Sequence, residues 1–243
     1  PTGSGKTTTL YTCLSRMNTD VHKIITIEDP IEYQLKGITQ IQINPAIGLT
    51  FARGLRSMLR HDPDIMMVGE VRDMETATTA IQVALTGHLI FSTLHTNDAA
   101  SGVARLLDMG VEAYLITSTV RCLIAQRLVR RLCPQCKTAL RLSEDMIREF
   151  GEQVAVEPGE VIYEHKGCEA CHHTGYSGRE AIYEFLVLND DIRKLILGRA
   201  TAGEIKAKAI ASGMKTLRRS GWEKIRQGVT TLQEVVRVTQ DGT

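Results

Sequence analysis

The chain has 243 residues, of which 43% are hydrophobic and 23% are charged, so it can bury one substantial core and carry a smaller module beside it. Its 29 lysine and arginine residues are balanced by 28 aspartate and glutamate residues, which argues against a broad basic surface for nucleic acid or anionic lipid. The sequence has neither an apolar run near the roughly 20 residues of a membrane-spanning helix nor a signal-peptide pattern at its start, so we expect membrane contact to come through a partner.

Short apolar runs alternate with helical patterns over the first 132 residues. The runs predict buried strands at residues 24–27, 65–68 and 89–93, because continuous apolar stretches of this length are typical of strands covered on both faces. Apolar residues recur at helical spacing in residues 51–59, 76–85 and 113–128. This alternation predicts an α/β fold in which helices flank a largely parallel sheet.

The chain opens with the sequence PTGSGKT, which matches the phosphate-loop pattern G-x-x-x-x-G-K-[ST] except for its first glycine, which would precede Pro1. In such a loop, backbone amides surround phosphate oxygens, a lysine neutralises them, and a hydroxyl, here that of Thr7, binds Mg²⁺. A turn that only caps a helix is the structural alternative, but nucleotide-related motifs follow at suitable distances. The residues predicted to bind ATP and Mg²⁺ are Gly3, Ser4, Gly5, Lys6, Thr7 and Thr8.

Two glutamates follow predicted strands. Glu28 ends the first strand, and Glu70 follows the second after Gly69, where many P-loop ATPases place an aspartate directly after the strand. The carboxyl ends of parallel strands meet at one edge of a sheet, so both side chains are expected near the phosphate loop. Either could deprotonate the attacking water while the other holds Mg²⁺. Helix capping is the structural alternative for each acid taken alone.

Two Cys-x-x-Cys pairs predict a metal site. The pairs lie within a stretch of weak periodicity at residues 133–179, and a chain without an export signal favours metal binding over disulfides. Four thiolates suit a tetrahedral, structural Zn²⁺, although an iron–sulfur cluster or a ligand from His172 or His173 remains a chemical alternative. The predicted ligands are Cys133, Cys136, Cys168 and Cys171.

The last part of the chain, from residue 180 to residue 243, reads as helical. Capping boxes are expected at Thr201 with Glu204 and at Thr231 with Glu234, because each pair has the spacing in which a threonine and a glutamate satisfy free amides at a helix start. Gly213 and Gly228 are expected just after helix ends.

Four motifs in this order resemble the secretion-superfamily ATPases that drive type II secretion and type IV pilus assembly. They are the phosphate loop, the Asp box TIEDPIE at residues 26–32, the segment RHDPD at 60–64 leading to GEVRD at 69–73, and the His box at 86–96. The resemblance implies a RecA-like P-loop NTPase core at residues 1–132, a zinc-binding tetracysteine insertion at 133–179 and a C-terminal helical subdomain at 180–243. It covers nearly the whole chain.

The resemblance also implies roles for single residues. Glu28 becomes the water-activating base, Glu70 the residue on the metal side, and His95 or His88 a neighbour of the γ-phosphate. Arginines 53, 56 and 60 share one face of a predicted helix, where salt bridges are the ordinary role, but Arg56 or Arg60 could reach a neighbouring subunit's phosphate. Arg72 is a further candidate.

A Mg-dependent ATPase is therefore the predicted function. By resemblance, it would act as a cytoplasmic homo-hexamer, bound peripherally to the inner membrane through platform proteins, and would power type II secretion by pseudopilus assembly. Type IV pilus assembly is the alternative within the family. A nucleic-acid-translocating RecA-like motor is disfavoured by the balanced charge, and an assembly module with negligible turnover is a third hypothesis.

Overall fold

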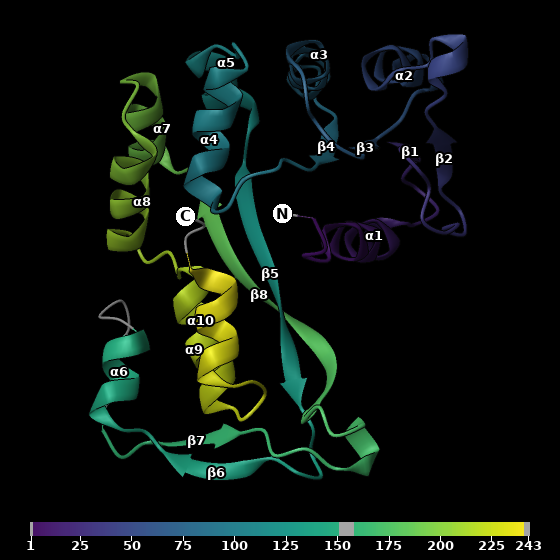
Figure 1. Ribbon diagram of the computed structural model, residues 1–243. Helices are drawn as coiled ribbons and strands as arrows, with labels where there is room; N and C mark the ends of the chain where they lie inside the picture. The colour runs from purple at the N-terminus through teal and green to yellow at the C-terminus, as the bar shows by residue number, and fades with distance from the viewer. Residues whose placement is uncertain (1, 151–157, 241–243) are drawn as a thin grey trace.

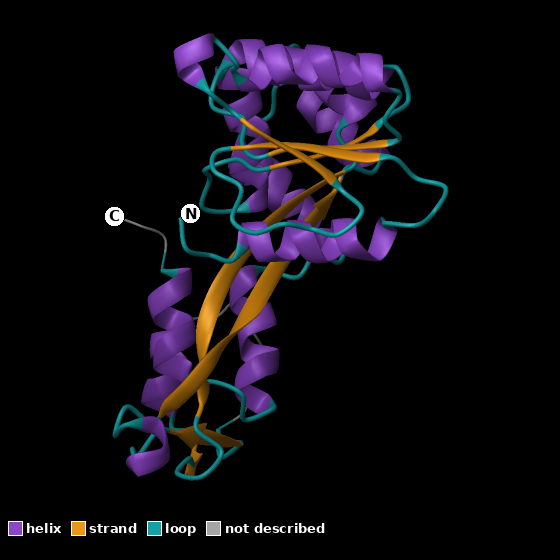
Figure 2. Ribbon diagram, turned by 90° about the vertical axis from the view of Figure 1, so that its right-hand side faces the viewer, coloured by secondary structure: helices purple, strands orange, loops and turns teal. Residues whose placement is uncertain are grey.

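The computed structural model describes residues 2–150 and 158–240. Outside this range lie Pro1 of the predicted ATPase core, residues 151–157 of the predicted tetracysteine insertion and residues 241–243 of the predicted helical subdomain. A wide upper part holds a parallel sheet, and a long hairpin leads from it to a narrower lower part (Figures 1 and 2). The sheet runs in the order β2 (Thr39–Gln42), β1 (Ile24–Glu28), β3 (Ile65–Val68) and β4 (Leu89–Ser92), with all neighbours parallel. The α/β class and three predicted strands are confirmed.

Helices cover both faces of this sheet. Alternate residues of β1 and β3 pack against Tyr11 and Leu14 of α1 (Lys6–Met17) on one face. The residues between them pack on the other face against α2 (Phe51–Met58) and α3 (Met74–Leu85), through Leu55, Met58 and Val83. Because both faces are buried, β1 and β3 are apolar except for the side chains that they direct at the site.

A long antiparallel hairpin connects the sheet region to the lower part of the molecule. Strand β5 (Cys122–Leu132) pairs with β8 (Tyr176–Val187) over nearly its full length. Around the hairpin lie α4 (Ala99–Asp108), α5 (Ala113–Thr119), α7 (Asp190–Leu197), α8 (Ala202–Ala211), α9 (Leu217–Arg226) and α10 (Leu232–Thr239) (Figure 1). These elements share one continuous core cluster.

The predicted helix at residues 113–128 is wrong beyond Thr119. The helix α5 stops there, and Cys122 begins strand β5 instead of lying in a helix. Leucine, alanine, glutamine and arginine in this segment favour helices, and its apolar spacing fits one. Pairing with β8, more than 40 residues further along the chain, overrides that local preference, because both strands bury side chains against the common core.

At the far end of the hairpin lies a small unit. It contains β6 (Thr138–Arg141) and β7 (Val161–Glu164), which pair in antiparallel fashion, the helix α6 (Glu144–Phe150) and the short turn Glu169–Cys171 (Figure 1). Phe150 and Ile162 join this unit to the core cluster of the hairpin helices, and the Phe150 ring lies 5.4 Å from that of Trp222 on α9. The unit therefore packs on the C-terminal helices.

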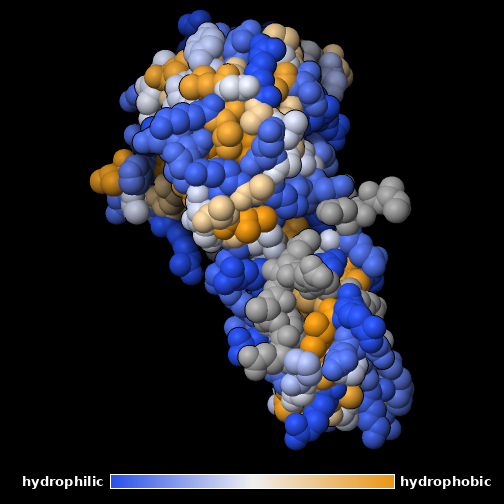
Figure 3. All heavy atoms as spheres, turned by 90° about the vertical axis from the view of Figure 1, so that its left-hand side faces the viewer, coloured by the Kyte–Doolittle hydropathy of each residue, from blue (hydrophilic) through white to orange (hydrophobic). Residues whose placement is uncertain are grey.

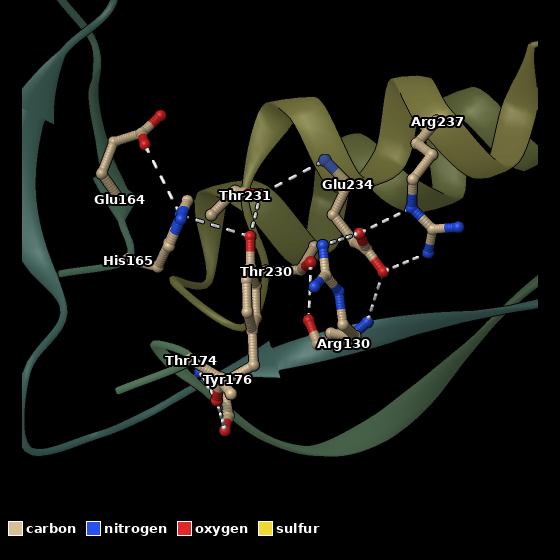
Figure 4. Close-up of polar contacts among 9 residues, drawn as sticks. All are labelled: Arg130, Glu164, His165, Thr174, Tyr176, Thr230, Thr231, Glu234 and Arg237. Atoms are coloured by element: carbon tan, nitrogen blue, oxygen red, sulfur yellow. Dashed lines mark hydrogen bonds and ion pairs between the residues drawn. The ribbon is translucent and has the colours of Figure 1, made fainter. Parts of the chain in front are cut away.

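The two predicted capping boxes have different outcomes. Thr201 and Glu204 form the reciprocal pair at the start of α8, as predicted. At the start of α10, Thr231 accepts from the Glu234 amide, but the Glu234 side chain turns to Arg130 at 2.8 Å and to Arg237 at 2.6 Å (Figure 4). Stronger charge-assisted bonds explain why Glu234 does not return to its own helix start. Positive φ angles at Gly213 and Gly228 agree with the predicted helix ends.

Polar side chains cover most of the face seen in Figure 3, and hydrophobic side chains appear there in separate patches. Among residues 2–150 and 158–240, no helix combines the length and the apolar composition required to cross a bilayer.

Candidate functional site

The phosphate loop turns through two glycines in the left-handed backbone region. Gly3 has a φ of 74° and Gly5 a φ of 84°, values that residues with a side chain rarely adopt. Gly5 stands at the start of α1 and, having no side chain, leaves the first amides of that helix without a side-chain cap. Such amides, together with the positive end of the helix dipole, attract phosphate.

Lys6 is the first residue of α1. Burial lowers the pKa of its ammonium group, and the nearby Glu70 carboxylate opposes that shift, whereas Arg127 adds to it. Negative charge placed beside Lys6 would raise its pKa again and stabilise the protonated form. The position is therefore suited to an anionic ligand.

Glu70 lies at the centre of a charged cluster at the carboxyl ends of β3 and β4. Its Oε1 is 2.6 Å from an Nη of Arg72, and its Oε2 is 3.1 Å from Nε2 of His95. Val71, Arg72, His95 and Arg105 line a cavity of about 490 Å³ beside this cluster. Because β3 and β4 are paired neighbours, residues that follow the two strands meet at this edge.

His88 lies at the opposite, amino-terminal end of β4. Its Nδ1 is 2.8 Å from the Thr86 hydroxyl and 3.3 Å from the Val83 carbonyl oxygen, so it joins the end of α3 to the start of the strand. The resemblance implies that His95 or His88 neighbours the γ-phosphate, and of these two histidines His95 lies beside Glu70.

Glu28 is buried under α1, and its hydrogen-bond partners among the described residues are all neutral. Tyr11 donates a short hydrogen bond to its Oε2, and its Oε1 accepts from the Thr26 hydroxyl at 2.6 Å and from Nε2 of Gln40 at 3.1 Å. Its exposed fraction is 3%. Burial, and then the hydrogen bond to Glu28, raise the pKa of Tyr11. Glu28 and Glu70 thus lie in different environments, one neutral and closed and the other cationic and beside a cavity.

The four cysteines converge as predicted. Their sulfur atoms all lie within 4.8 Å of one another, and the Sγ–Sγ distances of Cys133–Cys168, Cys136–Cys171 and Cys168–Cys171 are 3.9, 3.8 and 3.7 Å. Four sulfurs at the usual Zn–S distance of about 2.3 Å form a tetrahedron with edges of about 3.8 Å. The cluster therefore has the ligand type, number and spacing of a closed tetrahedral metal site.

Backbone amides surround the sulfur atoms. The amide of Gly167 donates to Sγ of Cys136 at 3.3 Å, and the amides of Cys168 and Gly175 each donate to Sγ of Cys171 at 3.2 Å. Although burial raises the pKa of the Cys171 thiol, these amides lower it to about 6. Donors of this kind favour the thiolates that bind metal.

Histidine does not replace cysteine in this cluster. His172 and His173 are exposed and occupy left-handed backbone positions with φ of 51° and 59°. Within the part of the chain that the structure describes, the metal-ligand cluster consists of the four cysteines alone. With four protein ligands, such a site leaves no open position for a substrate.

Comparison with known proteins assigns the family. The family model described as "Type II/IV secretion system protein" matches residues 1–237. The chain belongs to this type II/IV secretion system family. It is 54% identical over 241 residues to "Type II secretion system protein E" of Xanthomonas campestris pv. campestris, which covers 99% of this chain and 42% of that protein. It is 51% identical over 239 residues to "Type IV pilus assembly ATPase PilB" of Thermus thermophilus, covering 98% of this chain and 27% of that protein.

The chain thus spans less than half the length of these secretion-family relatives. Among solved structures, it resembles one titled "Crystal Structure of the Pilus Retraction Motor PilT and Bound ADP", with a TM-score of 0.71 and 30% identity over 99% of this chain and 60% of that one. A structure of the Legionella pneumophila ATPase DotB has a TM-score of 0.68 and 26% identity over 98% of this chain and 57% of that chain. The chain therefore shares its fold, a parallel-sheet core with C-terminal helices, with these two structures.

The predicted arginines lie on the other side of the sheet from the phosphate loop. Arg56 belongs to α2, which packs on the face opposite α1, and its Nη2 forms a 2.9 Å salt bridge to Glu75 of α3. Arg60 lies exposed in the short turn that follows α2. Within one chain, α1 with Lys6 packs on one face of the sheet, and α2, which carries Arg56 and leads to Arg60, packs on the other.

Three residues beside the site were missed by sequence reasoning. Tyr11 fits the apolar face of a helix, and nothing local distinguishes it from a core residue. Arg105 reaches the cavity from α4. Gln126 contacts the phosphate loop from β5, within a segment predicted to be helical. In each case the contact depends on tertiary packing, which no short sequence motif encodes.

Proposed function

We propose that the chain is the motor domain of a Mg-dependent ATPase that powers type II secretion. The observation that carries the proposal is the placement of Glu70, bound to His95, in electrostatic contact with Lys6 at the start of α1. An uncapped helix start with a lysine supplies phosphate binding, and a carboxylate beside it supplies the negative charge that Mg²⁺ requires. The family membership of the chain supports the same reaction.

In this proposal the two acids have separate tasks. Glu70 stands on the metal side with the Thr7 hydroxyl, and bound Mg²⁺ would neutralise charge on the β- and γ-phosphates. Glu28 would orient and deprotonate the attacking water. Its oxygens accept hydrogen bonds from Tyr11, Thr26 and Gln40, which fix the orientation of the carboxylate and leave one of its about four lone-pair positions for a water. His95 would hold Glu70 and approach the γ-phosphate.

The larger assembly is part of the proposal. We infer a cytoplasmic homo-hexamer in which Arg56 or Arg60 acts on a neighbour's nucleotide, since both lie on the face turned away from their own phosphate loop. It would be bound to the inner membrane through platform proteins and would drive pseudopilus assembly. Zn²⁺ in the cysteine cluster would have a structural role. Type IV pilus assembly is the second candidate, because the identity to a PilB protein, 51%, is close to the 54% found for a type II secretion protein.

Replacing Lys6 with alanine tests the phosphate site. We expect Lys6→Ala to lower ATP hydrolysis at least ~100-fold, because the lysine neutralises phosphate charge during transfer. Phosphate release and the melting temperature should be measured together, with Lys194→Ala, an exposed position on α7, as the matched control. A Lys6→Ala chain that turns over ATP like the control would refute the proposed site.

A further inference from the structure

The side chain of Gln126 connects β5 to the phosphate loop. Its Nε2 donates to the carbonyl oxygen of Ser4 at 2.7 Å, and its Oε1 accepts from the Thr9 hydroxyl at 2.9 Å. Only 7% of the residue is exposed. One amide group therefore holds both the loop and the first turn of α1, although it lies more than 110 residues further along the chain.

The bond to Ser4 determines where the next amide points. The peptide between Ser4 and Gly5 is trans, so its C=O and N–H groups point in opposite directions. A carbonyl oxygen held toward Gln126 therefore directs the Gly5 amide away from Gln126. A flip of this peptide turns ψ of Ser4 and φ of Gly5, and because Gly5 has no side chain to restrict its φ, the loop itself does not prevent the flip.

The packing of β5 against Gly5 is equally close. A Cβ atom built on Gly5 would lie 2.9 Å from Nε2 of Gln126 and 3.4 Å from a methyl group of Leu128. Gly5 is therefore required for two reasons, its left-handed backbone and the space that Gln126 occupies. Gln126 is buried at this contact, whereas Gly5 and Leu128 are half-buried.

We propose that Gln126 is a positioning residue for phosphate binding, which holds the Ser4–Gly5 peptide and the start of α1 in the orientation that presents amides to the nucleotide. The inference deepens the proposed ATPase function and rests on it. Gln126 itself does not touch the phosphates. Its role is to prevent the glycine-rich loop from sampling conformations in which the Gly5 amide is turned away.

Gln126→Glu is the sharpest variant, because it keeps the size and the acceptor for Thr9 but replaces the donor to Ser4 with a second acceptor. We expect the affinity for a non-hydrolysable ATP analogue with Mg²⁺, measured by calorimetry at pH 8.5, to fall about tenfold relative to wild type. At pH 5.5 the introduced carboxyl can be protonated and donate again, so the difference from wild type should shrink. A difference that does not respond to pH would overturn the proposal.

Two threonine variants provide the matched comparison. Thr9→Val removes one of the two bonds of Gln126 and should weaken analogue binding about threefold, with the melting temperature unchanged. Thr12→Val removes a hydroxyl of the same helix that donates to the Thr8 carbonyl oxygen instead of to Gln126, and binding should not change. If Gln126→Glu fails to fold, the two threonine variants still test the proposal. Equal affinities of Thr9→Val and Thr12→Val for the ATP analogue would overturn the role of Gln126.

Hydrogen exchange separates this inference from the ATPase proposal. In the nucleotide-free chain, amides of residues 2–9 should exchange faster in Gln126→Glu than in wild type. If wild type binds no analogue but this difference is present, the ATPase proposal fails and the positioning of the loop by Gln126 stands. If wild type binds the analogue and Gln126→Glu changes neither exchange nor affinity, the ATPase proposal stands and the role of Gln126 is refuted.

Discussion

The phosphate loop and the tetracysteine cluster lie along the same strand but differ in how completely one chain forms them. The loop lies beside the middle of β5, at Gln126, and the cluster begins at Cys133, directly after the end of that strand. The cluster has all four ligands at metal-binding distance and amides already directed at its sulfurs. One chain therefore supplies all four ligands of the cluster.

The phosphate site is open by comparison. Glu28 ends β1 and accepts hydrogen bonds from neutral donors, whereas Glu70 follows β3 and is bound to His95 and Arg72. Arg56 is held by Glu75 on the opposite face. A structural metal requires one fixed geometry, whereas a catalytic site must change partners when its ligand arrives.

Removing one ligand of the cluster should have the largest effect. Cys171→Ser is expected to reduce zinc from about one atom per chain to near zero, because structural zinc in small domains is bound with roughly 10 kcal/mol or more. Elemental analysis measures the metal, with Cys13→Ser, a cysteine of α1 outside the cluster, as the control. Iron in the wild-type chain, or no metal at all, would refute the zinc assignment.

The same variant tests whether the two regions are independent. Because the cluster lies beyond the end of β5 and Gln126 lies in its middle, we expect Cys171→Ser to change the affinity for an ATP analogue less than about threefold. A loss of affinity in step with the loss of zinc would show that the hairpin joins both regions into one cooperative unit.

Exchanging each glutamate for glutamine should have the next largest effect. Glu28→Gln is expected to lower kcat by at least ~100-fold without changing the Mg²⁺ requirement, because a general base contributes about 10²–10⁴ to the rate. Glu70→Gln should instead raise the Mg²⁺ concentration needed for half-maximal rate. Mg²⁺ titrations of steady-state hydrolysis distinguish them. Rescue of Glu28→Gln, but not of Glu70→Gln, by added Mg²⁺ would reverse the two roles.

The closed region could be predicted from sequence more fully than the open one. The spacing within each Cys-x-x-Cys pair is enough to predict a metal site, and the glycines of the phosphate loop are enough to predict its turn. The hairpin could not be predicted, because β5 is stabilised by pairing with β8 and its local composition favours a helix. The contact of Gln126 with Ser4 depends on that hairpin, and the contact of Tyr11 with Glu28 depends on the packing of α1 against the sheet.

Glu234 offers a smaller, pH-dependent test of the connection between the two regions. Burial raises its pKa, but hydrogen bonds from Arg237 and Arg130 outweigh burial and lower it to about 2. Arg130 lies on β5 between Gln126 and Cys133, and its guanidinium lies 4.1 Å from the centre of the Tyr176 ring (Figure 4). The carboxylate thus fastens α10 to the strand that passes from the loop to the cluster.

A carboxylate whose pKa is lower in the folded than in the unfolded chain stabilises the fold above its unfolded value, near pH 4.5, and this stabilisation disappears as the pH falls through about 2. Glu234→Gln should therefore lower the free energy of unfolding by about 3 kcal/mol at pH 7. Glu223→Gln, which breaks the exposed pair with Lys215, should cost less than about 1 kcal/mol. Urea unfolding measures both variants.

The decisive observation is how the difference between wild type and Glu234→Gln changes with pH. It should be constant from pH 7 to about pH 5 and shrink toward pH 2, because the wild-type carboxyl becomes protonated there. Zinc is lost from both chains in acid, so its loss cancels in the difference. A difference that stays constant down to pH 2 would mean that shape, not charge, holds α10 on β5. The two regions would then be joined by packing alone.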